Sequence, residues 1–104
     1  MKDAIFLASS KADLRAFPEI ARSAVGMELW QVQCGFPPSD WKPMPNIGPG
    51  VCELRIHAGG AFRILYLATR PEAIYVLHCF EKKSRKSRDN HLHLARQRLK
   101  TLEG

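Results

Sequence analysis

Hydrophobic and polar residues alternate in three runs between positions 51 and 80, and this period of two predicts three consecutive β-strands. The runs cover residues 51–57, 62–68 and 73–80, separated by Ala58-Gly59-Gly60 and by a four-residue turn at 69–72. Turns this short join neighbouring antiparallel strands, so the segment predicts an antiparallel meander. A fourth apolar run, Ala4–Ala8, predicts a buried strand near the N-terminus.

Apolar residues at spacings of three and four predict two helices, one before the meander in the chain and one after it. The first stripe consists of Ala21, Val25, Leu29 and Val32, and the second of Leu92, Ala95, Leu99 and Leu102. Gly35 is a typical helix stop for the first of them. Ser87 or Asp89 is the expected cap of the second.

A further short helix is predicted ahead of these two. Ser10 and Asp13 fit a capping box, in which a hydroxyl and an acid three residues later bond the first free backbone amides. Pro18 disfavours helical geometry in the residue before it, so this helix should end near Phe17.

Residues 36–50 have a different composition. They contain five of the seven prolines and two glycines, a composition that is incompatible with a helix or a central strand. We therefore predict a long loop without regular structure, packed on the body through Phe36, Trp41, Met44 and Ile47. A loop of this length in a small domain is often functional.

These elements predict one α+β domain over residues 1–104, a length sufficient for a single hydrophobic core. The three cysteines form no CxxC pair, so we expect reduced thiols. No segment has the features of a signal peptide or the length of a membrane span, so we expect a cytoplasmic protein without membrane contact.

Positive charge is concentrated at one end of the chain. The formal net charge is +6, and residues 82–100 hold eight basic residues against one acidic residue, Asp89. A field of this kind attracts polyanions, above all nucleic acid. A solvated basic helix or an acidic protein partner remains an alternative interpretation of the same segment.

Basic residues also stand inside the predicted strands. Arg55 and Arg63 either pair with a carboxylate such as Glu53 or clamp a phosphate, because a guanidinium is a rigid two-pronged donor. Lys82 and Lys83 directly follow the third strand of the meander, which would hold them near the sheet. His57 shares a face with Arg55, and His78 is expected on one face with Val76 and Phe80.

No motif indicates a metal or another cofactor. HxxxH and CxxC spacings are missing, and His91 and His93, two positions apart on a helix, point in different directions. We therefore expect no metal site and no cofactor.

Five fragments together resemble a known family. In chain order they are Asp40-Trp41-Lys42-Pro43-Met44, Ile47-Gly48-Pro49-Gly50-Val51, Glu53-Leu54-Arg55, Phe62-Arg63-Ile64-Leu65-Tyr66 and Leu77-His78-Cys79-Phe80-Glu81-Lys82-Lys83-Ser84. Each is weak alone, but the ordered set resembles the phage-derived, HigB-like branch of the RelE/ParE toxin superfamily. The likeness runs from about Phe6 to Leu102.

The resemblance implies a RelE-like α+β fold, with helices on one face of a four-stranded, largely antiparallel sheet. It implies the toxin of a type II toxin–antitoxin system, with a helix-turn-helix antitoxin as partner. RelE and HigB toxins are endoribonucleases that cut mRNA on the ribosome without a metal. Catalytic roles then go to Arg55, Arg63, Lys82 and Lys83, which match the family's basic positions. RNA contacts are expected at Lys42, Arg85, Lys86 and Arg88.

The proton-transfer groups are left open. His57, Glu53 and His78 are candidates, and a lysine near other cations can also exchange a proton. The chain has no clear tyrosine near its C-terminus that would match the family's general base. Two other functions stay open as well. One is a ParE-like toxin that inhibits DNA gyrase by binding, and the other an inactive phage-derived protein that only binds its antitoxin.

Overall fold

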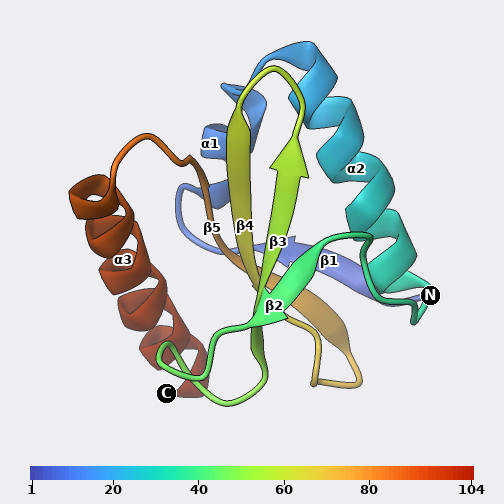
Figure 1. Ribbon diagram of the computed structural model, residues 1–104. Helices are drawn as coiled ribbons and strands as arrows, with labels where there is room; N and C mark the ends of the chain where they lie inside the picture. The colour runs from blue at the N-terminus through green and yellow to red at the C-terminus, as the bar shows by residue number, and fades with distance from the viewer.

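A five-stranded mixed sheet lies between helices on both of its faces in the computed structural model, which describes residues 1–104 (Figure 1). In chain order the elements are β1 Asp3–Phe6, α1 Ser10–Arg15, α2 Glu19–Gln33, β2 Trp41–Pro43, β3 Val51–His57, β4 Ala61–Leu67, β5 Ala73–Glu81 and α3 Arg85–Glu103. The strands lie in the order β1-β5-β4-β3-β2.

The predicted meander is confirmed. Strands β3, β4 and β5 pair antiparallel, and Arg55 of β3 lies opposite Arg63 of β4. Gly59, in the turn between β3 and β4, has a φ of +74°, a conformation that glycine adopts without strain. The hairpin signal in the sequence therefore reports the backbone geometry of this turn correctly.

The sheet is largely antiparallel as predicted, since three of its four strand pairings are antiparallel, but it has five strands instead of four. A fifth strand, β2, lies in the segment expected to have no regular structure, and it pairs antiparallel with β3. Pro43 can belong to it because β2 is an edge strand, where a missing backbone N–H costs no sheet hydrogen bond. At the opposite edge β1 pairs parallel with β5, which makes the sheet mixed.

The prediction that all helices pack on one face is also wrong. One core cluster joins Ala21, Val25 and Leu29 of α2 to Leu54, Ile64 and Val76. A second joins Leu92, Ala95 and Leu99 of α3 to Leu65, Leu67 and Leu77. The strands carry apolar residues on both faces, so each face requires its own cover. Helix α3 therefore lies on the face opposite α1 and α2 (Figure 1).

A bulge in β5 changes the direction of one candidate residue. Tyr66 of β4 lies opposite Val76, whereas the preceding residue, Leu65, lies opposite His78, so one residue of β5 is extra. Beyond such a bulge the alternation of faces shifts by one. His78 consequently lies toward α3, whereas Val76 belongs to the core under α2. The predicted shared face is therefore wrong for Val76 and confirmed for Phe80, which stacks on His78 under α3.

Helix starts differ from those predicted. The hydroxyl of Ser10 donates to the carbonyl of Val76 at 3.2 Å instead of capping α1, which begins at this residue. Helix α3 begins at Arg85 because the side chain of Ser84 accepts the amide of Ser87. None of the helices combines the length and the apolar character that crossing a membrane requires.

Candidate functional site

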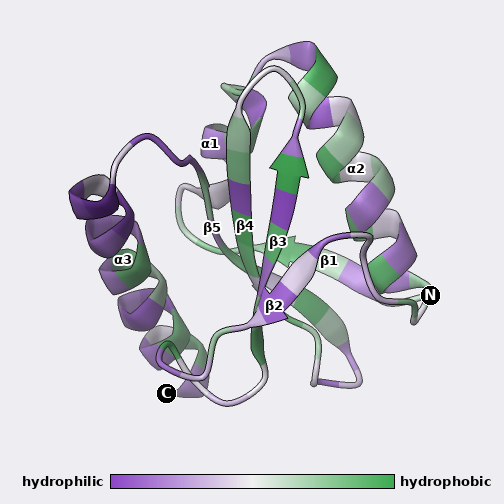
Figure 2. Ribbon diagram, viewed as in Figure 1, coloured by the Kyte–Doolittle hydropathy of each residue, from purple (hydrophilic) through white to green (hydrophobic).

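A cleft of about 390 Å³ opens beside the sheet where the start of α3 meets β3 and β4. No hydrophobic residue lines it. The lining residues are Lys42, Glu53, Arg55, Arg63, Lys82, Lys83, Ser84, Arg85 and Arg88. Seven of these nine carry a positive charge and only Glu53 a negative one, so the cleft fits an anion. Figure 2 shows that the first turns of α3, which border it, are also strongly hydrophilic.

The sheet register brings the basic side chains together. Arg55 and Arg63 are direct cross-strand partners, and Lys42 of β2 lies opposite Glu53 of β3. The backbone amide of Lys82 donates to the carbonyl of Ala61 at 2.7 Å. This bond continues the pairing of β5 beyond its last residue, so the two lysines that follow the strand start from a fixed position.

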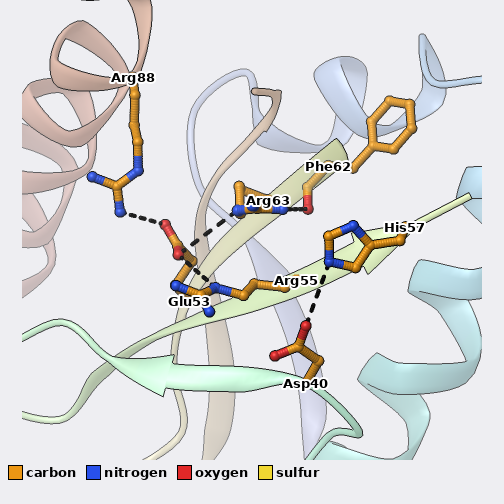
Figure 3. Close-up of polar contacts among 7 residues, drawn as sticks. All are labelled: Asp40, Glu53, Arg55, His57, Phe62, Arg63 and Arg88. Atoms are coloured by element: carbon orange, nitrogen blue, oxygen red, sulfur yellow. Dashed lines mark hydrogen bonds and ion pairs between the residues drawn. The ribbon is translucent and has the colours of Figure 1, made fainter. Parts of the chain in front are cut away.

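A buried carboxylate lies at the base of the cleft. Glu53 is 0% exposed, and guanidinium groups from three elements surround it (Figure 3). Its Oε1 lies 3.3 Å from Arg55 Nε and 3.8 Å from Arg63 Nε, and its Oε2 lies 3.0 Å from a terminal nitrogen of Arg88. A buried charge is tolerated only when paired. The ion pair with Arg88 thereby ties α3 to the sheet.

Arg63 is the least exposed cation of the three, with a side chain that is 7% exposed. Burial lowers the pKa of its guanidinium, and the nearby charge of Glu53 opposes that effect. One of its terminal nitrogens donates to the carbonyl of Phe62 at 3.1 Å. Arginine does not deprotonate in proteins, so Arg63 is a fixed positive charge at the cleft floor.

Most of the residues singled out from the sequence meet in this cleft. They are Arg55, Arg63, Lys82 and Lys83 of the catalytic set, Lys42, Arg85 and Arg88 of the RNA-binding set, and Glu53. Lys86 does not line the cleft. His57 lies outside it as well, exposed and 3.5 Å from the carboxylate of Asp40 (Figure 3).

His78 lies in a separate cluster on the α3 side of β5. A terminal nitrogen of Arg98 is 2.8 Å from His78 Nδ1, and His78 Nε2 is 2.6 Å from His91 Nδ1. Arginine only donates, so Nδ1 of His78 accepts and Nε2 carries the proton that it donates to His91. Asp13 of α1 lies 3.7 Å from His78 Nδ1.

This cluster keeps His78 neutral. Burial, followed by the charge of Arg98 and by His91, lowers the pKa of His78 to about 4, and Asp13 opposes the shift. Burial also lowers the pKa of His91. Both imidazoles therefore hold their hydrogen-bond directions near neutral pH.

Comparison with known proteins places the chain in a family. A family model described as phage-derived protein Gp49-like (DUF891) matches residues 12–100, which is most of the chain. The chain belongs to this family. Gp49-like proteins are related to toxin–antitoxin systems and are RelE-like. No curated protein matches the chain.

Sequence reasoning missed the histidine cluster of this Gp49-like protein. The spacing of His91 from His93 argues only against a shared metal, and the position of Asp13 predicts only a helix cap. Arg98 carried no signal other than its charge. The three come from α1 and α3 and meet only through β5, so no local spacing could have indicated them.

Replacing Glu53 with Gln should destabilise the Gp49-like protein by about 3 kcal/mol, because Arg55, Arg63 and Arg88 then lose their shared buried counter-charge. Sulfate, which can occupy the resulting cationic site, should raise the melting temperature of Glu53→Gln more than that of the wild type. Glu103→Gln, at the exposed end of α3, is the control. Thermal unfolding in a sulfate series measures both effects, and equal sulfate responses would contradict the role of Glu53.

Lowering the pH should destabilise the protein through His78. The folded-state pKa lies below the value of about 6.5 in the unfolded chain, so from pH 6.5 to 4 only the unfolded state binds this proton. Between pH 7.5 and 5 the resulting loss is about 2 kcal/mol. Denaturant titrations should show a smaller loss for His78→Gln, but not for His93→Gln, whose side chain is exposed. A His78→Gln variant with the wild-type pH dependence would refute this assignment.

Proposed function

We propose that this Gp49-like protein is the toxin of a type II toxin–antitoxin system and an endoribonuclease of the HigB-like branch. Its substrate is mRNA on the ribosome, and its chemistry needs no metal. The family relationship supports the toxin assignment at a coarse level. The composition of the cleft, seven cations around a buried carboxylate, is the observation that carries the nuclease assignment.

The proposed reaction is an internal transfer at phosphorus. The ribose 2′-oxygen bonds to the adjacent phosphorus, the bond to the 5′-oxygen breaks, and the products are a 2′,3′-cyclic phosphate and a 5′-hydroxyl. One proton passes from the 2′-hydroxyl to solvent water, and another passes from an acid of the protein to the departing 5′-oxygen. Negative charge builds up on the phosphorane oxygens between these events, and preorganised donors that stabilise such charge accelerate a reaction by several kcal/mol.

Arg63 and Arg55 supply these donors. Their cross-strand pairing holds two guanidiniums next to each other, and Glu53 orients both through its Oε1. The side chains therefore lose little conformational entropy when a phosphate binds, which is the advantage of a preorganised site. Arg63 is the proposed phosphate clamp because it is the most buried of them.

Lys82 and Lys83 have a different proposed role. Both are exposed at the cleft, and an ammonium is a point charge on a flexible stem, suited to a moving phosphate backbone. They also carry transferable protons, whereas both oxygens of Glu53 are occupied by guanidiniums. We therefore assign proton donation to the 5′-oxygen to one of these lysines.

The ribosome and the antitoxin are the proposed partners. The cleft has no hydrophobic or aromatic side chain on which a base could stack, so it binds the phosphate while other surfaces orient the mRNA. A helix-turn-helix antitoxin encoded next to the toxin would neutralise the toxin with an acidic segment that covers the same cations.

Arg63→Ala should reduce ribosome-dependent mRNA cleavage about a hundredfold, the cost of one lost transition-state contact. Primer extension on mRNA from a translating extract measures it. Arg63→Lys should recover only part of the activity because a point charge does not reproduce the two-pronged contact. Arg22→Ala, at an exposed position of α2, is the matched control.

Thermal unfolding and antitoxin binding of the same Arg63→Ala sample separate catalysis from folding. Glu53 keeps Arg55 and Arg88 as partners, so the variant should remain folded. Full cleavage by Arg63→Ala would overturn the site assignment. Inhibition of gyrase-dependent supercoiling by the wild type, without mRNA cleavage, would instead establish the ParE-like function.

Lys82→Ala should lower the salt dependence of RNA binding. Each lost phosphate contact reduces the slope of log affinity against log salt concentration by about 0.7 for a single strand. Fluorescence anisotropy with a labelled, non-cleavable RNA at several salt concentrations measures this slope. Lys100→Ala, exposed at the far end of α3, should leave it unchanged. An unchanged slope in Lys82→Ala would remove Lys82 from the RNA path.

A further inference from the structure

A second depression lies next to the cleft, between α1, β5 and α3. Its apolar lining comes from Ala16, Phe17, Cys79 and Phe80, and its polar lining includes Asp13 from α1, Glu81 from β5 and His91 from α3. Its volume, about 410 Å³, is similar to that of the cleft. The two differ in character, because only charged and polar residues line the cleft, whereas hydrophobic residues also line the depression.

Lys83 joins the two sites. It lines both depressions, while its neighbour Ser84 lines only the cleft. Its side chain is 74% exposed, and its only ion pair is with Glu81 at 3.9 Å. A strand of RNA whose phosphate lies in the cleft can therefore continue past this ammonium group and reach the second depression, whose lining also includes the carboxylates of Asp13 and Glu81.

Asp13 and His91 each leave one polar atom in the depression without a partner. Asp13 Oδ2 accepts from the hydroxyl of Ser9 at 2.9 Å, and Oδ1 has no side-chain partner. His91 Nδ1 accepts from His78, so the proton of His91 resides on Nε2, which makes no hydrogen bond within the protein. The Arg98–His78 contact fixes this tautomer, because Arg98 forces Nδ1 of His78 to accept.

The ring of His91 is also held in place. It stacks on Phe80 with ring centres 4.3 Å apart and planes 12° apart. His78 stacks on the same phenylalanine at 5.6 Å. Stacking and hydrogen bonding together give the donor of His91 a defined direction, which base recognition requires.

We propose that this depression binds the base of the nucleotide next to the phosphate in the cleft, with a preference for guanine. This inference rests on the proposed function. A base has apolar faces and a polar edge, which match the mixed apolar and polar lining of the depression. Guanine alone among the four RNA bases presents two adjacent N–H donors, N1–H and the 2-amino group, to a carboxylate. Its O6 accepts from a donor such as His91 Nε2–H.

The other bases fit less well. Adenine and cytosine each direct a ring-nitrogen lone pair toward the carboxylate beside their single amino group, and uracil offers one N–H between two carbonyls. The binding affinity falls by about tenfold or more when the carboxylate loses a hydrogen bond or faces a lone pair of the base. Asp13 is therefore the residue that sets the specificity.

Four fluorescein-labelled, 2′-O-methyl pentanucleotides with the central base G, A, C or U on a uridine background test the proposal. Fluorescence anisotropy should show the G probe binding the wild-type protein about tenfold more tightly than the other three. In Asp13→Asn the G preference should fall to about twofold, while the U probe binds at least as tightly as before because a negative charge has been removed.

Asp89→Asn, which removes an exposed acid elsewhere, should shift all four affinities equally and keep the preference. His91→Ala should weaken the G probe alone, and His93→Ala should not. Circular dichroism verifies that each variant is folded. His91→Ala and Asp13→Asn report on the pocket independently, so misfolding of one leaves the other as the test.

The outcomes separate this proposal from the proposed function. Equal, salt-dependent binding of all four probes by the wild type would overturn the base site and leave the phosphate cleft intact. A G preference that survives in both Asp13→Asn and His91→Ala would likewise overturn it. If no probe binds even at low salt, the proposed function fails and the base site fails with it.

Discussion

Three guanidinium groups from β3, β4 and α3 surround one buried carboxylate, Glu53, and the shape of the cleft depends on this contact. Without this carboxylate the three cations would repel one another, and Arg88 would lose the ion pair that holds it over the sheet. With it, the repulsion is compensated below the cleft, while the outer surfaces of the cations stay available to an anion. The same carboxylate therefore stabilises the docking of α3 and prepares the site, so stability and function share one interaction.

The position of α3 makes this contact possible. Alternate residues of β3 point to opposite faces, with Leu54 in the core under α2 and Glu53 toward α3. If α3 packed beside α2, Arg88 would be separated from Glu53 by the thickness of the sheet. The apolar residues on both faces of β4 and β5 prevent that arrangement, because the second face would be left exposed to water.

The bulge in β5 has a comparable effect on the second depression. One extra residue turns His78 toward α3, where Arg98 and His91 enclose it. His78 cannot exchange protons readily near neutral pH, because burial keeps it neutral. It acts instead as a hydrogen-bond spacer that orients His91. A strand irregularity thus connects the fold to the group that we propose contacts a base.

The sequence by itself determined the elements governed by local physics. The meander, the stripe Ala21–Val32 on α2 and the glycine turn at Gly59 follow from periodicity and backbone freedom, and the concentration of basic residues that line the cleft was visible as charge. Tertiary structure alone decided the two-sided sheet, the edge strand β2, the bulge beside Leu77 and the meeting of Asp13 with His91 and Arg98. These features arise from contacts between segments far apart in the chain, and such contacts leave no period or spacing in the sequence.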